Sequence, residues 1–224
     1  MRGSLAGICV LFDLDGTLVD TAEDLAAAMN AALFRDGRRP IGTGRVRGLI
    51  GGGARAMLTQ GLAENGATQP SAEDVDRLTG FFLEHYEAHI ADHSAPFPGV
   101  IEAIGALKAD GAKVAICTNK RERLARMLAA ALGIENLFDA IVGPDTVGAA
   151  KPDPRPLIFC LGATGAATGV YVGDSDTDIS AAAAAAMPCL LHLGGYGPFS
   201  LRAGAFATLP DYRDLVDCVR KAAF

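Results

Sequence analysis

Apolar runs that end in polar turns recur along the chain and predict the strands of a sheet. The first run covers residues 8–12 and stops at Asp13. Because its side chains do not alternate between apolar and polar, it is typical of a strand buried on both faces. Further runs of this kind cover residues 114–117, 140–142, 170–172 and 189–191.

Helical periodicity fills the intervals between these runs. Apolar positions three or four residues apart predict helices over residues 100–110, 121–132, 156–161, 179–186 and 212–219. A chain in which strands and helices alternate in this way favours a parallel sheet with helices on both faces. We therefore expect an α/β fold with a Rossmann-like core.

Residues 21–95 interrupt the alternation, because they contain helical patterns and no good strand pattern. Apolar spacing predicts helices near Leu25, Val46 and Met57 and a long one over residues 75–90. A segment of this size suits a small domain. We therefore expect a helical cap domain at residues 21–95, inserted after the first strand of a core domain made of residues 1–20 and 96–224.

Composition narrows the class of protein. Half of the 224 residues are apolar, which is enough for one core domain with a smaller insert. The net charge of −6 argues against nucleic acid as a partner, and no apolar stretch is long enough to span a bilayer. Cysteines inside predicted strands indicate buried, reduced thiols. We expect a cytoplasmic protein that is a monomer or a homodimer.

Polar residues directly follow the predicted strands or precede the helix that leads to one of them. In open parallel sheets, ligands bind beyond the carboxyl ends of the strands. The side chains that could meet at that edge carry carboxylate, amide, hydroxyl or ammonium groups: Asp13, Asp15, Thr118, Asn119, Lys151, Asp174 and Asp178.

Such a group of side chains suits phosphoryl transfer. Clustered carboxylates repel one another unless a cation lies among them, and hard oxygen ligands suit Mg²⁺. A carboxylate can also act as a nucleophile and form an acyl phosphate. Mg²⁺ and Lys151 would neutralise charge, and Thr118 with backbone N–H groups would donate hydrogen bonds.

Four short segments resemble the motifs of haloacid-dehalogenase-type phosphatases. Residues 13–17, Asp-Leu-Asp-Gly-Thr, resemble the first motif, and Thr118-Asn119 the second. Lys151-Pro152 resembles the third, and residues 173–178 resemble the fourth. The order and spacing also agree, and the resemblance covers nearly the whole chain.

The resemblance implies a role for each aspartate. Asp13 attacks phosphorus and becomes phosphorylated, while Asp15 protonates the leaving alcohol and then activates water. Mg²⁺ is held by Asp13, by the backbone carbonyl of Asp15 and by Asp174. Asp178 supports this metal site by contacting the ligands rather than the ion. True dehalogenases of the superfamily lack the second aspartate of the first motif, so Asp15 favours phosphoryl chemistry.

The resemblance also assigns phosphate binding to Thr118, Asn119 and Lys151. The inserted segment resembles the helical cap of one branch of the superfamily, and phosphoglycolate phosphatases are its best match there. Segments 24–28, 50–54 and 118–120 carry that similarity, together with residues 195–197. The implied substrate is a small phosphorylated metabolite, 2-phosphoglycolate, which is hydrolysed to glycolate and phosphate.

A glycine cluster in the predicted cap is a further candidate for substrate contact. Backbone N–H groups of Gly51, Gly52 and Gly53 could face a small carboxylate, especially where a helix begins after them. Arg55 could add positive charge.

Two other functions use the same residues or the same fold. A sugar-phosphate phosphatase or a β-phosphoglucomutase-like phosphotransferase would use the same aspartates, but residues 41–60 show no obvious sugar-binding set. A catalytically silent binding module is also compatible with the fold. The intact set of Asp13, Asp15, Lys151 and Asp174 argues against a silent module.

Two local patterns lead to structural expectations only. The family often has glycine just before Met-Pro, where this chain has Ala186; we expect the helix to end differently rather than place alanine in a left-handed conformation. His85, His89 and His93 recur every four residues on a predicted helix. We expect them to be surface or packing side chains rather than zinc ligands.

Overall fold

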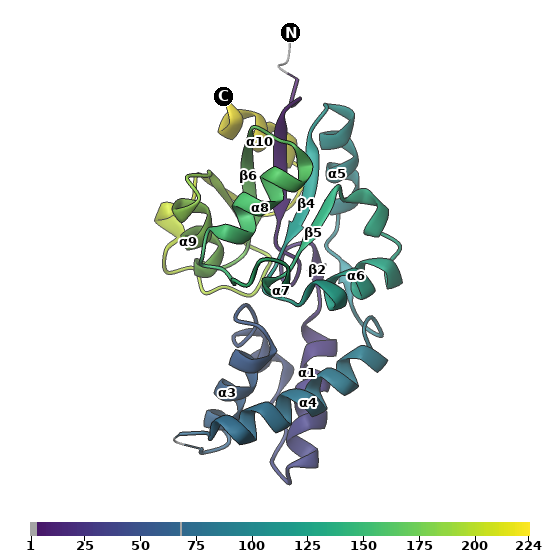
Figure 1. Ribbon diagram of the computed structural model, residues 1–224, viewed down its shortest axis with the longest axis vertical. Coiled ribbons are helices and arrows are strands. Elements are labelled where there is room, and N and C mark those ends of the chain that lie inside the picture. The colour runs from purple at the N-terminus through teal and green to yellow at the C-terminus, as the bar shows by residue number, and fades with distance from the viewer. Residues whose placement is uncertain (1–3, 68) are drawn as a thin grey trace. The chain divides into compact units, whose positions relative to one another are not determined.

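The computed structural model describes residues 4–67 and 69–224, and within them the chain divides into two compact units (Figure 1). We call residues 1–20 and 96–224 the core unit and residues Thr21–Ala95 the cap unit. Short strands β2 (Val19–Asp20) and β3 (Ala95–Pro96) pair where the chain passes from one unit to the other and back.

The core unit contains a parallel sheet with strand order β5-β4-β1-β6-β7-β8. The strands in chain order are β1 (Ile8–Phe12), β4 (Lys113–Cys117), β5 (Ala140–Val142), β6 (Thr168–Gly173), β7 (Cys189–His192) and β8 (Ala207–Leu209). All five residues of β1 are buried, which explains their unbroken apolar character. Phe12 is in register with Ile116 and Val172, so β1, β4 and β6 end at one level.

Helices pack against both sides of this sheet (Figure 1). Helices α8 (Arg155–Thr164) and α9 (Asp176–Ala184) contribute to a buried cluster that includes Cys9 and Leu11 of β1. Helices α5 (Val100–Ala109) and α10 (Leu215–Ala223) contact each other and also contact β4 and β6 respectively. Helix α6 (Glu122–Ala131) packs against β5, and the short α7 (Pro144–Val147) contacts α6 and α8.

The sequence pattern missed strand β8 of the large sheet and the two-residue strands β2 and β3, and it misplaced the starts of α4 (Ala72–Ala88), α9 and α10 by three residues each. Strand β8 is only three residues long and only Leu209 in it is buried, so it has no continuous apolar run. The last helix begins at Leu215 rather than at Tyr212. Tyr212 is buried, but it lies before the helix, so its apolar character reflects packing and not helical periodicity.

The expectation for Ala186 is wrong, because this residue is left-handed with φ of 53°. It is the one non-glycine residue with positive φ in the part of the chain that the structure describes. The Met187 N–H donates to the Ala182 carbonyl at 2.9 Å, which is the long closing bond of a Schellman turn. The turn directs the chain from the end of α9 towards β7, and it places Ala186 in a left-handed conformation that is strained for alanine.

The cap unit is helical, as the pattern predicted. It contains α1 (Ala22–Arg35), α2 (Thr43–Arg47), α3 (Ala54–Glu64) and α4 (Ala72–Ala88). Helix α1 packs against α4 through a buried set that includes Met29, Leu33, Phe82 and Tyr86. None of the helices in the described residues is both long and apolar enough to cross a membrane.

The three cap histidines do not share one helical face. Helix α4 ends at Ala88, so His93 lies outside it, and its backbone N–H donates to Asp24 at 3.0 Å. His85 and His89 stack with their ring centroids 4.5 Å apart, and His89 pairs with Asp92 at 2.7 Å. The carboxylate group that could hold a metal among residues 4–67 and 69–224 includes none of these histidines.

All five cysteines are free thiols, and four of them are buried: Cys9, Cys117, Cys160 and Cys189. Burial raises the pKa of Cys9 to about 11, so this thiol stays protonated at neutral pH. The prediction of buried thiols is therefore confirmed for Cys9, Cys117 and Cys189, the cysteines inside predicted strands, and Cys160 is buried as well, in α8.

Candidate active site

The parallel strands bring the predicted core residues to one edge of the sheet. Asp13 directly follows β1, and its backbone N–H still donates to the Val172 carbonyl of β6 at 2.9 Å. Thr118 follows β4 and is tied in the same way to Val142 of β5 at 3.1 Å. Asp174 follows β6. All three polar side chains are buried, because neighbouring strands and loops surround them.

Lys151 is the centre of the buried charge cluster. Its Nζ lies 3.0 Å from Asp13 Oδ2, 2.7 Å from Asp178 Oδ1 and 2.8 Å from the Tyr171 hydroxyl oxygen. An ammonium group has three N–H donors, so each can be matched with one of these acceptors. The Tyr171 hydroxyl donates a hydrogen bond to the Cys117 carbonyl oxygen at 2.9 Å, which leaves its own oxygen to accept from Lys151. Lys151 is thus held in a defined direction before any substrate arrives.

Burial and neighbouring charges set the protonation of this cluster. Burial raises the pKa of Asp13 to about 6, although the Lys151 ammonium opposes that shift. Burial disfavours the charged form of Lys151, but Asp13 and Asp178 outweigh it and raise the pKa of Lys151 above its usual value. At neutral pH, Asp13 is therefore a carboxylate beside a permanently charged lysine, which suits a nucleophile for an anionic phosphate.

Asp174 faces the same edge and is oriented by two donors. Thr17 Oγ1 donates to Asp174 Oδ1 at 2.9 Å, and the Tyr196 N–H donates to Oδ2 at 2.7 Å. Burial raises the pKa of Asp174 well above the usual range, and Asp178 and Asp13 add to the shift. A Cβ at Gly195 would lie 2.3 Å from Asp174 Cβ, so only glycine permits this close approach.

The carboxylates fit a hard divalent cation. Oxygens of Asp13, Asp174 and Asp178 lie within 4.8 Å of one another. Two raised pKa values in this group mark carboxylates whose charges lack compensation, which a cation would supply. Oxygen ligands with room for waters and phosphate oxygens are the set that Mg²⁺ prefers.

Asp178 is already engaged by protein donors. Its Oδ2 accepts from the Asp174 N–H at 3.1 Å and from the Ser175 hydroxyl at 2.6 Å, while Oδ1 faces Lys151. It lies in the first turn of α9 and is fully buried. These bonds suit a residue that fixes the loop carrying Asp174, whereas Asp13 and Asp174 are better placed as direct ligands.

Asp15 pairs with Lys120. Lys120 Nζ lies 2.5 Å from Asp15 Oδ1, and both side chains are largely buried. The Lys120 backbone N–H also donates to Thr118 Oγ1 at 3.2 Å. The Asp15 carboxylate is outside the possible metal-binding group found in the described residues, which leaves its backbone carbonyl as the predicted ligand atom.

Asn119 holds the segment that carries Lys151. Its Nδ2 donates to the Lys151 carbonyl at 3.1 Å, and its Oδ1 accepts from the Lys151 N–H at 2.8 Å. This pair of bonds joins the loop after β4 to the turn before α8. The predicted phosphate-binding residue Asn119 therefore positions Lys151 through these bonds.

Tyr171, Lys120 and Thr17 are among the residues with polar contacts in the site that were not assigned a role from the sequence. Tyr171 lies within a predicted strand, so its apolar neighbours indicated packing rather than function. The available signal was its hydroxyl, which needs a hydrogen-bond partner when the residue is buried. Lys120 belongs to segment 118–120, which carries the resemblance to phosphoglycolate phosphatases, but the resemblance alone gave it no role. Thr17 ends the first motif, and its contact with Asp174 joins residues 157 positions apart.

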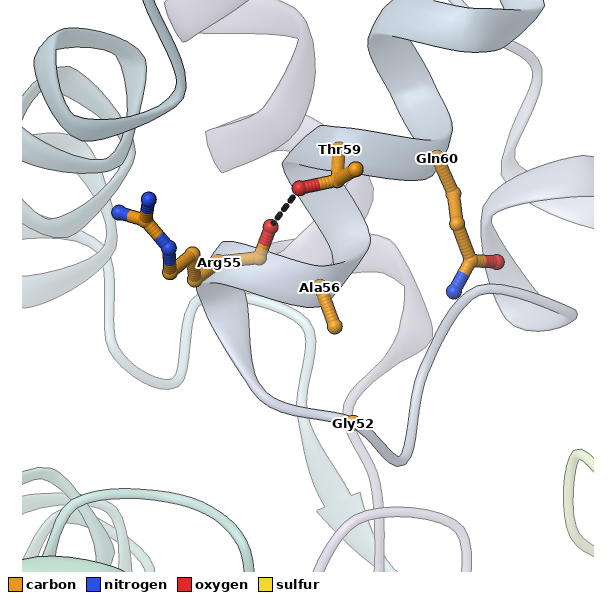
Figure 2. Close-up of a pocket in the computed structure, with 5 residues that line it drawn as sticks. All are labelled: Gly52, Arg55, Ala56, Thr59 and Gln60. Atoms are coloured by element: carbon orange, nitrogen blue, oxygen red, sulfur yellow. Dashed lines mark hydrogen bonds between the residues drawn. The ribbon is translucent and has the colours of Figure 1, made fainter. Parts of the chain in front are cut away.

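Some of the cap residues predicted for substrate contact line a pocket within the cap unit. A pocket of about 420 Å³ is lined by Gly52, Arg55, Ala56, Thr59 and Gln60 (Figure 2). The Arg55 side chain points away from Gly52 and Gln60 (Figure 2) and pairs with Asp76. The pocket therefore includes two of the four predicted cap residues, and the charge of Arg55 is directed elsewhere.

Comparisons with known proteins agree with this geometry. The model of the haloacid dehalogenase-like hydrolase family matches residues 10–191. The chain is 43% identical over 194 residues to a phosphoglycolate phosphatase of Caulobacter vibrioides, covering 86% of this chain and 81% of that protein. It is 35% identical over 213 residues to a phosphoglycolate phosphatase of Chromobacterium violaceum, covering 94% and 96%.

Solved structures show the same fold. A predicted phosphoglycolate phosphatase from Haemophilus somnus superposes with a TM-score of 0.85 at 27% identity, covering 97% of this chain and 98% of that one. CbbY from Rhodobacter sphaeroides in complex with phosphate superposes with a TM-score of 0.80 at 24% identity, covering 94% and 98%. At that identity, the likeness to CbbY concerns the fold.

Proposed function

The chain belongs to the haloacid dehalogenase-like hydrolase family, and from that membership we propose that it hydrolyses 2-phosphoglycolate to glycolate and phosphate with the help of Mg²⁺. It is a phosphoric monoester hydrolase, as its relatives are. The observation that carries the proposal is the buried pair of Asp13 and Lys151, 3.0 Å apart at the carboxyl edge of the sheet.

Asp13 is the nucleophile in the proposed mechanism. Its carboxylate oxygen attacks phosphorus, the bond from phosphorus to the leaving oxygen breaks, and an aspartyl phosphate forms. Asp15 gives a proton to the leaving oxygen and so releases the alcohol. Asp15 then accepts a proton from a water that attacks phosphorus, which releases phosphate and restores the Asp13 carboxylate.

Lys151 and Thr118 position the phosphoryl group. Lys151 offers a point charge that is fixed in direction by Asp178 and Tyr171. Thr118 presents a buried hydroxyl at the end of β4. Mg²⁺, held by Asp13, Asp174 and the backbone carbonyl of Asp15, would supply further positive charge to the phosphoryl oxygens.

The substrate proposal rests on the relatives. Phosphoglycolate phosphatases from Caulobacter vibrioides and Cereibacter sphaeroides are 43% and 40% identical to this chain over more than four fifths of its length. For the cap we propose that N–H groups of Gly51, Gly52 and Gly53, which precede α3, contact the substrate. Arg55 has a smaller role, because its charge is already paired with Asp76.

The setting of the enzyme follows from its thiols and its substrate. Free, buried cysteines suit a reducing compartment, so we place the enzyme in the cytoplasm. Its partner is a small phosphorylated metabolite rather than nucleic acid or membrane. It acts as a monomer or a homodimer.

The test is phosphate release with and without Mg²⁺ from a panel of 2-phosphoglycolate and several sugar phosphates. We expect strong Mg²⁺-dependent release from 2-phosphoglycolate and little from the sugar phosphates. Release from sugar phosphates alone would overturn the substrate and keep the site. No release from any ester by folded protein would overturn the hydrolase mechanism.

A further inference from the structure

We propose that Lys120 determines substrate specificity by binding the carboxylate of the leaving group, so that the enzyme selects phosphate esters of small hydroxy acids. This inference rests on the proposed function of the same site, because it assumes that Asp15 delivers the proton to the leaving oxygen. The two buried lysines then have different roles. Lys151 binds the phosphoryl group, and Lys120 binds the leaving group.

The first support is the burial of Lys120. The residue is 8% exposed, and its ammonium lies 2.5 Å from Asp15 Oδ1. Burying a charged group is costly unless it is paired, and lysine is rarely buried without a role. A surface lysine that merely improves solubility would not lie beside the carboxylate assigned to proton transfer.

The second support is the defined position of the Lys120 backbone. Its N–H donates to Thr118 Oγ1 at 3.2 Å, so Lys120 is tied to a predicted phosphate-binding residue. On the other side, a Cβ at Gly143 would lie 2.7 Å from the Lys120 carbonyl oxygen, so the loop after β5 packs tightly against this segment. The side chain is therefore directed from a fixed backbone.

The third support is substrate geometry. A group that donates a proton to the leaving oxygen lies about 2.6–3.2 Å from it. In 2-phosphoglycolate a single methylene separates that oxygen from the carboxylate. An ammonium in contact with Asp15 is consequently close to the place where the carboxylate must lie. One N–H of Lys120 can stay with Asp15 while another binds the substrate, because an ammonium has three donors.

Lys151 is not positioned for this task. Its three neighbouring acceptors are Asp13, Asp178 and Tyr171, and all of them lie on the nucleophile side of the site. Lys120 contacts Asp15, which acts on the opposite end of the bond that breaks. Lys120 is therefore the buried lysine beside the residue that acts on the leaving group.

A simpler role for Lys120 is to orient Asp15 without touching the substrate. That role would affect every phosphate ester alike, because each needs a proton on its leaving oxygen. Selection of a carboxylate instead changes the ratio of activities between a charged and a neutral leaving group. The ratio therefore separates the two roles.

The experiment compares kcat/KM for 2-phosphoglycolate and 2-hydroxyethyl phosphate, in which a neutral hydroxymethyl group replaces the carboxylate. Wild type, Lys120→Met, Lys120→Arg and the control Lys113→Met are measured with Mg²⁺. Lys113 is an exposed lysine at the opposite end of β4. We expect Lys120→Met to reduce the preference for 2-phosphoglycolate by at least about thirtyfold, Lys120→Arg to restore part of it, and Lys113→Met to leave it unchanged.

An unchanged preference in Lys120→Met, with equal losses on both esters, would overturn the inference and leave Lys120 as a residue that orients Asp15. Activity of the variant on the neutral ester shows that it is folded, and Lys120→Arg serves the same purpose if Lys120→Met does not fold. A wild-type enzyme that releases phosphate without preferring 2-phosphoglycolate would instead overturn the proposed substrate. The two failures are thus distinguishable.

Discussion

The buried site of the core unit and the pocket of the cap unit place their cationic side chains in opposite environments. In the core, the Lys151 side chain is 1% exposed and contacts Asp13 and Asp178. In the cap, the Arg55 side chain is 53% exposed and its partner Asp76 is 65% exposed. Water screens the cap pair, so it contributes less than about 1 kcal/mol, whereas the core cluster interacts at a low local dielectric. The Lys151 ammonium is therefore held in a fixed position for catalysis, whereas the Arg55 guanidinium is exposed and only weakly held by its partner.

The comparison is tested most severely by removing the nucleophile. Asp13→Asn keeps the size of the side chain and removes its charge, so we expect kcat to fall by at least about a thousandfold. The matched control is Asp153→Asn, which alters a partly exposed carboxylate two residues after Lys151 that pairs with Arg155. Steady-state kinetics with 2-phosphoglycolate would measure both. Equal activity of the two variants would refute the role of Asp13.

Metal affinity should depend on pH because protons compete for the same carboxylates. Burial raises the pKa of Asp13 to about 6, and the pKa of Asp174 is raised as well. The carboxylate form binds the cation and prevails above the pKa, so affinity for Mg²⁺ should fall by about tenfold per pH unit below about pH 6. Calorimetric titration of Mg²⁺ at several pH values measures this slope. A flat profile down to about pH 5 would contradict the assigned ligands.

Tyr171 tests whether the direction of Lys151 matters. Tyr171→Phe keeps the ring and removes the oxygen that lies 2.8 Å from Lys151 Nζ. We expect kcat to fall by about tenfold with little change in KM, since one hydrogen bond to a charged group is lost. Tyr86→Phe, which removes the hydroxyl of a buried tyrosine in the cap unit, is the control and should leave kcat nearly unchanged. A purely structural role for Tyr171 would lower stability and leave kcat intact.

Ala186 lies in the core unit but outside the charge cluster, so its replacement should affect stability only. Glycine adopts positive φ without strain, and Ala186→Gly should raise the free energy of unfolding by about 1 kcal/mol. Urea denaturation measures the gain, and kcat should not change. A loss of stability would show that the turn after α9 is not strained.

The smallest effect is expected in the cap. Arg55→Ala removes an exposed ion pair, so KM for 2-phosphoglycolate should change by less than about threefold. Asp76→Ala removes the other member of the pair and is the matched control. A tenfold rise in KM for Arg55→Ala alone would mean that the cap supplies substrate charge, and it would weaken the contrast between the two units.

The sequence predicted the fold and the family well because both depend on local patterns. Residues 8–12 form a continuous apolar run, and such runs in alternation with helices identified the parallel sheet. The α/β fold and the resemblance to haloacid dehalogenase-like hydrolases are confirmed by the family match and by the solved structures. Strand β8 was not predicted because a strand of three residues with one buried side chain has no continuous hydrophobic pattern.

The missing parts of the site depend on contacts that are distant in the sequence. The bond from Thr17 to Asp174 and the pair of Lys120 with Asp15 form only when separate loops meet at the sheet edge. The left-handed Ala186 was missed for another reason, because alanine disfavours positive φ and the sequence does not show that a Schellman turn forms there. The motifs therefore indicated which loops carry the catalytic residues, but not which side chains in those loops contact one another.

The central claim, that Asp13 carries the phosphoryl group, is tested most directly by trapping it. Acetyl phosphate has a leaving group that departs without protonation, so it should phosphorylate Asp15→Asn protein, which then lacks the group that activates water. Acid quenching and peptide mass spectrometry would locate the phosphoryl group. We predict a phosphorylated peptide modified at Asp13 that is absent from Asp13→Asn protein. Phosphate release by wild type together with no modification of Asp13 in Asp15→Asn protein, or modification at another residue, would contradict the account.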